Sequence, residues 1–355
     1  MDSTPPAVRR LALQNRTSGG LKLTAMPPPT GEIDGRRFWA DLRAAIGSAV
    51  VVGDEPLRLL AIALLAHGHA LVEDVPGVGK TLLTRAFSRA LGLTSARIQG
   101  TPDVLPSDIL GSSLLEAGQF RFVPGPVFAN VLLVDEINRA TPRTQSALLE
   151  AMEERQVSIE GETRPLPDPF LVLATQNPIE LEGTFALPEA QLDRFLVRLH
   201  LGYPDGDQER RIASRYQASA DPLAAVDPVV DIGGVLQMRD RVRTIAVSEP
   251  VEAYVVALTR ATRELPDLRL GASPRASVAL YRAAQAAAFL VGRTYALPDD
   301  VQSVAPAVLG HRVLLDLDRE LRGMSASTVI GDLIASVEAP PQPEEPAVGE
   351  SSSGA

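Results

Sequence analysis

The stretch EDVPGVGKT at residues 73–81 combines two closely spaced glycines with a lysine and a hydroxyl side chain. Gly77 and Gly79 allow the backbone to turn its N–H groups toward phosphate oxygens. Lys80 can neutralise the β- and γ-phosphates of a nucleotide, and the Thr81 hydroxyl can complete the shell of a Mg²⁺ ion. These residues therefore predict a phosphate loop.

The strict phosphate-loop pattern has glycine at position 74, where this chain has Asp74. The departure weakens the match to the pattern, but the other residues still stand between an expected strand and an expected helix. A glycine-rich loop that binds no ligand is the alternative. We expect the nucleotide to contact Pro76, Gly77, Val78, Gly79, Lys80, Thr81 and Leu82.

Two acidic residues follow the apolar run 131–134, which has the composition of a strand buried on both faces. Asp135 and Glu136 would emerge at the carboxyl end of that strand, beside the phosphate loop. Asp135 is suited to hold Mg²⁺ together with Thr81, and Glu136 to orient or deprotonate an attacking water. Such a pair is common at strand ends, but behind a phosphate loop it indicates nucleotide hydrolysis.

Three further polar residues could act on a nucleotide. Asn177 in ATQNP could hold the attacking water or a γ-phosphate oxygen, or it could simply form a turn before proline. Arg194 in LPEAQLDRF could reach a neighbouring subunit's γ-phosphate, or pair with Asp193 on the surface. Arg275 in GASPRAS stands in the first turn of an expected helix, where an arginine is normally solvated surface.

The elements that must position these residues alternate between strand and helix. Apolar runs predict strands at 70–73, 96–99, 131–136, 170–176 and 195–201, with helical patterns at 81–91 and 141–155 between them. This alternation indicates an α/β fold with a parallel sheet and crossover helices. Beyond residue 207 the chain shows successive helices, including 273–290, so a smaller all-helical domain follows.

Composition narrows the function classes. The chain has 355 residues, a formal net charge of −10, no cysteine and four histidines. The charge argues against a nucleic-acid coat, and the missing cysteines exclude a disulfide framework and a cysteine nucleophile. His67 and His69 lie close together, but no third ligand of suitable type follows nearby. Without a membrane-length apolar stretch or a secretory signal, we expect a cytoplasmic protein that does not span a membrane.

The two ends of the chain are rich in proline, glycine and small polar residues. Such segments cannot bury enough apolar surface to offset the entropy lost on ordering. The expected organisation is therefore a flexible tail at 1–35, an α/β core at 36–204, a helical domain at 205–338 and a disordered tail at 339–355.

The motifs in this order resemble those of the AAA+ ATPases, which have a P-loop NTPase core and a helical lid. The sequence between them resembles the MoxR family. The matching stretches, spread over residues 41–337, are LVEDVPGVGKT, RIQGTPDVLPSDILG, FRFVPGPVFANVLLVDEINRATPRTQSALLEAMEERQVSI, VLATQNPIELEGTFALPEAQLDRFL and GASPRA.

The resemblance implies roles for individual residues. Lys80 and Thr81 would be the phosphate-loop pair, Asp135 the Mg²⁺-associated acid and Glu136 the base that activates water. Asn177 would be sensor 1, Arg194 the arginine finger that acts on a neighbour, and Arg275 sensor 2. ATP would lie between the core and the lid, close to residues 50–52 and the helix of Arg275. Arg139 and Arg143 are secondary candidates at the subunit edge.

Two insertions read as hairpins with glycine turns. One lies within residues 100–128 and turns at Ala117 and Gly118, and the other, RQVSIEGETRPLP, turns at Glu160 and Gly161. In related ATPases such hairpins point toward the central pore or the substrate, although they could also be structural decoration.

The resemblance also implies partners. The chain would assemble into a ring, expected to be a hexamer, and would act on a client protein, often one with a von Willebrand factor type A domain. Such ATPases assist maturation or metal insertion. Three alternatives remain: the ATPase subunit of a metal chelatase, a nucleic-acid motor, and a nucleotide-dependent scaffold with little turnover. The second hairpin sets Arg155 and Arg164 against two glutamates, which suits a phosphate backbone poorly.

Overall fold

A five-stranded parallel sheet forms the centre of the α/β core, with the strand order β2-β5-β8-β1-β9. The strands are β1 (Ala70–Glu73), β2 (Ser95–Gln99), β5 (Val131–Asp135), β8 (Leu171–Gln176) and β9 (Val197–Leu199). All five expected strands are present. The computed structural model describes residues 33–75, 77–116, 119–177, 183–218 and 221–341. Residues of β5 are buried throughout, as a central strand covered on both faces requires.

Helices cover both faces of this sheet. They are α1 (Gly35–Ala49), α2 (Asp54–Leu65), α3 (Lys80–Ala90), α4 (Pro106–Leu110), α5 (Pro142–Glu154) and α6 (Glu189–Leu192), with the 3-10 turns η1 (Pro126–Phe128) and η2 (Ile137–Arg139). On one face Leu42, Ile46 and Phe87 belong to the larger apolar core. On the other face Leu149 and Phe170 belong to a second core. The sheet is thus held in place between two apolar layers.

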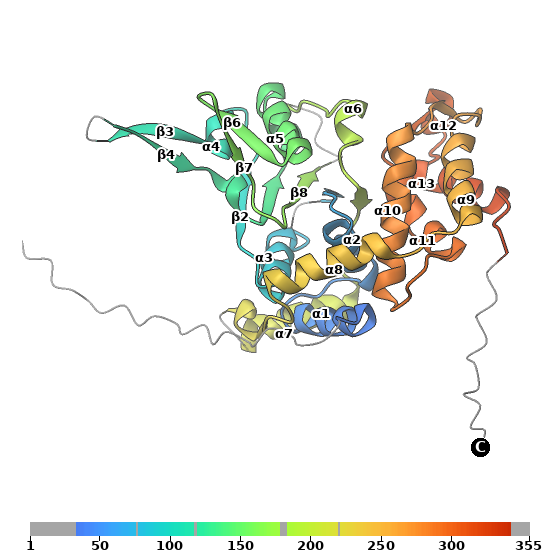
Figure 1. The fold of residues 1–355 in the computed structure, drawn as a ribbon, viewed down its shortest axis with the longest axis horizontal. Coiled ribbons are helices and arrows are strands. Elements are labelled where there is room, and N and C mark those ends of the chain that lie inside the picture. Colours follow the sequence, from blue (N-terminus) through green and yellow to red (C-terminus); the bar gives the residue numbers. More distant parts are fainter. Residues whose placement is uncertain (1–32, 76, 117–118, 178–182, 219–220, 342–355) are drawn as a thin grey trace, which may run out of the picture.

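Both expected hairpins are present and project from the same side of the core (Figure 1). They are β3 (Gly111–Glu116) with β4 (Gln119–Pro124), and β6 (Gln156–Ile159) with β7 (Glu162–Pro165). Ala117 and Gly118, the expected turn of the first, lie outside the described residues. In the second turn Glu160 and Gly161 have φ angles of 52° and 82°, the left-handed conformation that two-residue hairpin loops favour.

The helical lid lies beside the core (Figure 1). It comprises α9 (Glu249–Ala261), α10 (Pro274–Leu290), α11 (Pro298–Leu309), α12 (Leu317–Leu321) and α13 (Ala326–Ser336), and α8 (Ile232–Thr244) leads into it. The alanine-rich α10 is buried along most of its length, because small side chains allow close helix packing. One difference from the expected all-helical domain is a short antiparallel pair, β10 (Leu268–Leu270) with β11 (Leu314–Leu315).

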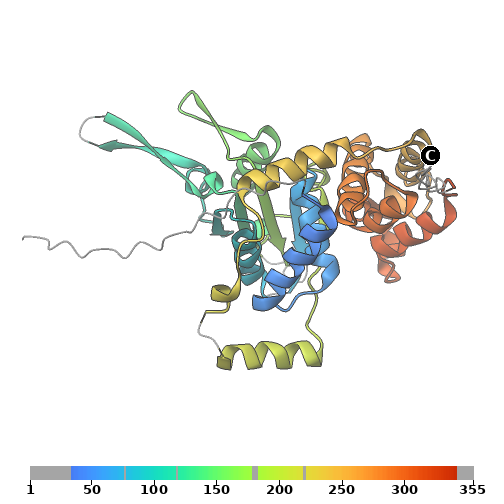
Figure 2. The same cartoon turned by 60° about the horizontal axis from the view of Figure 1, so that its bottom comes forward.

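The segment that joins core and lid is not simply part of the lid. Helix α7 (Gly206–Ala218) stands apart from the sheet (Figure 2), and the turn η3 (Pro222–Ala225) follows it. Val226 and Val230 then pack into the larger core, and Val229 N–H donates to the Ala90 carbonyl at 2.8 Å. Residues 222–230 therefore belong to the core by packing, although the sequence placed them in the lid.

The ends of the folded part differ slightly from the sequence-based boundaries. Asp34 caps α1 and Gly35 is its first residue, so two residues expected in the flexible tail belong to the folded part. The remaining tail residues, 1–32 and 342–355, lie outside the described part of the chain. In the described ranges every helix is too short or too polar to cross a bilayer.

Candidate nucleotide-binding site

The predicted phosphate loop lies at the carboxyl end of β1 and leads directly into α3. Gly77 and Gly79 have φ angles of 89° and 87°, and a Cβ at either position would meet open space. Backbone freedom, rather than room for a side chain, therefore requires glycine there. The amino terminus of α3 contributes free N–H groups and a positive dipole to the same point. Pro76 lies outside the described residues.

Asp74, the departure from the standard pattern, anchors this loop. Its buried carboxylate accepts the backbone N–H of Leu201 and, at 3.2 Å, that of Gly202. Its own backbone carbonyl accepts from Lys80 Nζ at 3.0 Å. The carboxylate thus ties the phosphate loop to the end of β9, a contact that the glycine of the standard pattern could not make.

Lys80 sits among acidic groups. Burial lowers the pKa of Lys80 from its ordinary value, while the charges of Asp74, Asp135 and Glu136 oppose this shift. Because their charges act on the pKa of Lys80, all three carboxylates lie near its ammonium group, as expected for a site that binds a highly charged ligand. Thr81 is half-buried in the first turn of α3, next to Lys80.

Asp135 and Glu136 are positioned by a neighbouring strand. Thr175 Oγ1, buried in β8, donates to Asp135 Oδ1 at 3.4 Å and accepts the Glu136 N–H at 2.9 Å. Arg97 Nε donates to Asp135 Oδ2 at 2.6 Å from the edge strand β2. Neither Thr175 nor Arg97 was predicted from the sequence. A hydroxyl within the otherwise apolar run of β8 was the available signal for Thr175.

Glu136 and Asn177 complete this end of the sheet. Glu136 has a left-handed backbone with φ 55°, and its Oε2 lies 3.2 Å from Arg139 Nη1. Because β8 lies between β5 and β1, Asn177 at its carboxyl end stands between the acidic pair and the phosphate loop. Arg139 thus contacts the acidic pair of its own chain, whereas Arg143 is exposed in the first turn of α5.

The donor set at this edge fits Mg²⁺. Mg²⁺ is usually held by one or two carboxylates together with substrate phosphates and water. Thr81 and Asp135 provide a hydroxyl and a carboxylate beside the phosphate loop, so they match this mode. Across the described residues, no cluster of three or more histidine or acidic side chains offers an all-protein metal cage.

His69 has a structural role. Its buried ring accepts the Val172 N–H at Nδ1, 3.0 Å, and its Nε2 lies 3.1 Å from the Met152 carbonyl. Burial lowers the pKa of His69 to about 3, so the ring is neutral near pH 7. His69 thus serves packing at the entrance to β1, whereas His67 is half-buried and its Nε2 lies 2.9 Å from Arg243 Nη2.

Arg194 and Arg275 both pair with Glu153, at the opposite end of the sheet. Arg194 Nε lies 3.1 Å from Glu153 Oε2, and Arg275 Nη2 donates to the other oxygen of the same carboxylate. Leu196 N–H bonds to the His69 carbonyl at 2.8 Å, which places this group before the first residues of β1 and β9. A four-residue strand spans about 13 Å, so the phosphate loop is remote. The expectation that ATP lies beside Arg275 of the same chain is therefore wrong.

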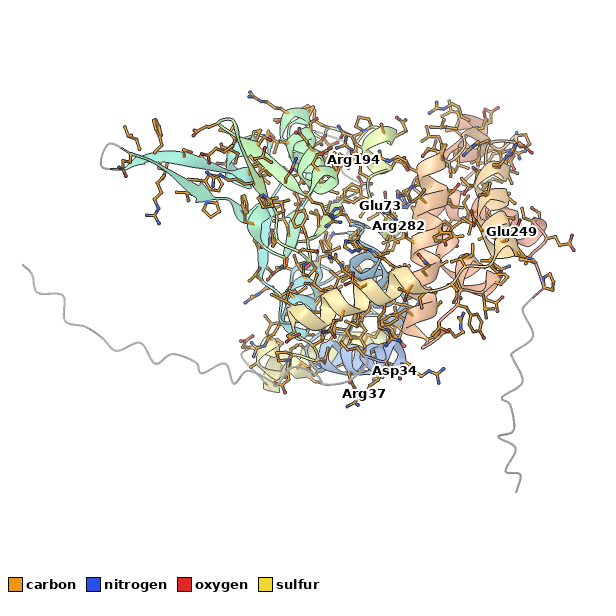
Figure 3. All side chains as sticks on the ribbon, in the orientation of Figure 1. Asp34, Arg37, Glu73, Arg194, Glu249 and Arg282 are labelled. Carbon is orange, nitrogen blue, oxygen red and sulfur yellow. The ribbon has the colours of Figure 1, made fainter. Side chains whose placement is uncertain are left out.

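A cavity of about 1290 Å³ opens where these arginines lie, between core and lid. Arg194 from the core and Arg282 from α10 both line it (Figure 3). Its walls carry six arginines and four carboxylates: Arg155, Arg194, Arg243, Arg275, Arg282 and Arg312 against Glu153, Asp168, Asp193 and Glu252. The positive excess suits an anionic group entering from outside the chain.

Four features together define an AAA+ nucleotide-binding protein. They are the parallel sheet, the phosphate loop after its interior strand β1, the acidic pair after β5 and the helical lid. Residues 69–197 match the model for the ATPase family associated with various cellular activities, and residues 260–330 match an AAA lid domain. The chain belongs to the MoxR family of AAA+ ATPases.

Individual relatives cover most of the chain. It is 43% identical to the chaperone MoxR1 of Mycobacterium tuberculosis over 303 residues, 82% of this chain and 80% of that protein. It is 44% identical to YeaC of Bacillus subtilis over 314 residues, 86% of this chain and 98% of that protein. A crystal structure of a Cytophaga hutchinsonii protein aligns with a TM-score of 0.81 at 39% identity, covering 86% and 96% of the two chains.

Proposed function

We propose that this chain hydrolyses ATP within a ring of identical subunits and uses the energy to remodel or mature a client protein. One observation carries this proposal. Lys80 and the acidic pair lie at one end of the sheet, while Arg194 and Arg275 lie together at the other end. A single chain therefore holds two halves of a site that are complementary but far apart, and a neighbour would bring them together.

The residues at the phosphate loop would perform the chemistry. Backbone N–H groups and Lys80 would bind the β- and γ-phosphates, and Thr81 and Asp135 would hold Mg²⁺, which neutralises phosphate charge when bound. Glu136 would accept a proton from water as its oxygen attacks the γ-phosphorus, and the bond to the β–γ bridging oxygen would break to release ADP and phosphate. Asn177 would orient that water.

The two arginines would act on the next subunit. Arg194 would stabilise the charge that develops on the neighbour's γ-phosphate, and Arg275 would sense the same nucleotide. Family resemblance supports six subunits in the ring. This arrangement also explains why the arginines point into a cavity at the edge of the chain rather than toward their own phosphate loop.

Steady-state ATP hydrolysis and nucleotide binding test this assignment. Lys80→Ala should abolish binding, and Glu136→Gln should abolish hydrolysis while binding persists. Arg194→Ala should lower turnover by about 10³-fold or more with ATP binding retained. Unchanged turnover in Arg194→Ala would remove this residue from the site.

The longer hairpin supports a protein client. Leu115 and Phe120 face each other across β3 and β4 and are 65% and 75% exposed. Exposed apolar side chains of this size are typical of surfaces that contact other proteins. Family resemblance suggests a client with a von Willebrand factor type A domain, and assistance with its maturation or metal insertion.

The client can be captured with Glu136→Gln held in ATP. A Leu115→Ser and Phe120→Ser variant of the same protein is the control, and it should lose the client while ATP binding persists. Client maturation that survives without hydrolysis would support a scaffold instead. Steep, salt-dependent stimulation by single-stranded DNA would support a nucleic-acid motor, and dependence of tetrapyrrole metallation on this chain would support a chelatase subunit.

A further inference from the structure

One turn of the lid reaches the segment that carries Arg194. Arg312 follows α11, and its side chain is only 3% exposed. Its Nε donates to Asp193 Oδ1 at 2.7 Å, its Nη2 to the Asp193 carbonyl at 3.1 Å, and its Nη1 to the Leu196 carbonyl at 3.0 Å. The same Nη2 also donates to the Phe195 carbonyl. One guanidinium therefore contacts the chain on both sides of Arg194.

The neighbouring residue of the turn adds a further contact. His311 is buried, and its Nε2 lies 2.9 Å from the Phe195 carbonyl, so this nitrogen donates to it. Residues 311 and 312 together thus contact three of the four residues in 193–196. The backbone of Arg194 is consequently attached to the lid as well as to the core.

Asp193 extends this attachment to Arg275. While Oδ1 of Asp193 accepts from Arg312, Oδ2 accepts from the Ser273 hydroxyl at 2.9 Å. Ser273 caps α10 by accepting the backbone N–H of Arg275 at 3.2 Å. A single carboxylate therefore links the segment of Arg194 to the helix start that carries Arg275.

Arg198 connects the same turn to the end of β1. Arg198 Nη2 donates to the Gly310 carbonyl at 2.9 Å, and Arg198 Nη1 lies 3.2 Å from Glu73 Oε2 at the end of β1. The turn at 310–312 is thus linked through Arg198 to the strand that leads into the phosphate loop, and through Arg312 to the segment of Arg194.

We propose that Arg312 is a positioning residue for the neighbour's active site. It holds Arg194 and, through Asp193 and Ser273, Arg275 as one unit with the lid of the same chain. A movement of the lid in one subunit then moves both arginines relative to the nucleotide of the next. This inference rests on the proposed function, in which Arg194 acts on a neighbouring subunit.

Lysine cannot replace Arg312 in this role. The guanidinium presents donors in a fixed planar fork, which here serve a carboxylate and several carbonyls at once. A lysine ammonium keeps the charge but cannot span the same acceptors. Arg293 offers a matched control, because it forms a comparable lid pair with Asp300, with both contacts at 2.6 Å. Its hydrogen bonds go to the lid and not to residues 193–196.

Mixed rings separate positioning from general stability. A Glu136→Gln subunit cannot hydrolyse ATP but supplies Arg194, whereas an Arg194→Ala subunit has an intact phosphate loop but no finger. Mixing the two inactive proteins should restore hydrolysis at the phosphate loop of each Arg194→Ala subunit whose neighbour is a Glu136→Gln subunit, because that neighbour supplies Arg194. Arg312→Lys is then placed in either member of the mixture, and the restored rate is measured.

The two placements should give different results. Arg312→Lys in the Glu136→Gln subunit should lower the restored rate at least about fivefold, since a misplaced catalytic group loses rate steeply. In the Arg194→Ala subunit it should leave the rate unchanged. Arg293→Lys should have no effect in either position. If Arg312→Lys does not fold, Asp193→Asn replaces it with the same expectations.

Other outcomes overturn the inference in distinct ways. If Arg312→Lys lowers the restored rate equally in both placements, Arg312 only stabilises the fold. If it lowers the rate in neither, Arg312 does not position Arg194. If the mixture of Glu136→Gln and Arg194→Ala restores no hydrolysis, the trans arrangement of the proposed function fails as well. Only in that last case are both conclusions lost.

Discussion

Glu153 holds two arginines that come from different domains. Its Oε2 lies 3.1 Å from Arg194 Nε, and its Oε1 accepts from Arg275 Nη2. Arg194 stands just before β9 in the core, whereas Arg275 begins α10 in the lid, 122 residues from Glu153 in sequence. The carboxylate at the end of α5 therefore keeps two like charges side by side.

Glu153→Gln should lower turnover without loss of ATP binding. The amide keeps the size of the side chain but removes the charge, so Arg194 and Arg275 would repel each other and move apart. Displacement of catalytic groups by about 1 Å can cost 10²-fold, and we expect a loss of about 10- to 100-fold in kcat. Glu150→Gln, exposed on the same helix, is the control for steady-state hydrolysis. Wild-type kcat in Glu153→Gln would show that the carboxylate does not organise the pair.

Thr175→Val tests the support of the acidic pair. Valine has nearly the same shape, but it can neither accept the Glu136 N–H nor donate to Asp135. A buried N–H left without a partner costs about 1–3 kcal/mol, and Glu136 would shift. We expect kcat to fall by about tenfold with little change in ATP affinity. Thr163→Val, on the exposed hairpin strand β7, should behave as wild type in the same assay.

Substitutions of Asp74 test why this chain departs from the standard phosphate loop. Asp74→Gly restores the standard pattern, yet it removes the acceptor for the N–H groups of Leu201 and Gly202. We therefore expect it to weaken ATP binding and to lower the free energy of unfolding by about 1–3 kcal/mol. Asp74→Asn keeps one acceptor oxygen and should lose less of both. An Asp74→Gly protein with tighter ATP binding would contradict the anchoring role.

The buried histidines predict a loss of stability in mild acid. Burial lowers the pKa of His69 to about 3 in the folded chain, whereas in the unfolded chain the pKa of this imidazole is near 6.5. The unfolded state therefore binds the proton of His69 more tightly. The stabilising contribution is complete above about pH 6.5 and is lost as the pH falls toward 3. For this fully buried group the slope is about 1.4 kcal/mol per pH unit. The buried His311 shifts in the same direction.

Urea unfolding at pH 7.5, 6.5 and 5.5 measures this slope, since carboxylates stay largely ionised over that range. His69→Asn can still accept the Val172 N–H but does not titrate. The dependence of its unfolding free energy on pH should therefore correspond to about one proton fewer than in the wild type. Equal slopes for both proteins would show that His69 does not carry the effect.

The phosphate-loop end of the site was predictable because its signals are local. Glycine spacing before Lys80, and an apolar run that ends in Asp135, can be recognised without knowledge of the fold. Parallel strands then bring the ends of these segments to one edge, so the cluster follows from the strand assignment alone. Both hairpins were predictable for the same reason.

The opposite end of the site depends on contacts between distant segments. Glu153 looks like an ordinary solvated residue near a helix end, and its position between two arginines follows only from how the lid sits on the core. Arg312 likewise gains its partners from a segment 116 or more residues away. Local patterns contain no information about such pairings, which explains why Arg275 was expected beside the phosphate loop of its own chain.

The contact between the two hairpins has a mechanical consequence. The guanidinium carbon of Arg164 lies 4.2 Å from the centre of the Phe122 ring, which braces β7 against β4. Only Arg155 separates the end of α5 from the start of β6. A force on β4 would therefore be passed through this contact to β7 and β6, and from there to α5. That end of α5 carries Glu153 and its two arginines, so the exposed apolar side chains of the longer hairpin would be coupled mechanically to the arginines between core and lid.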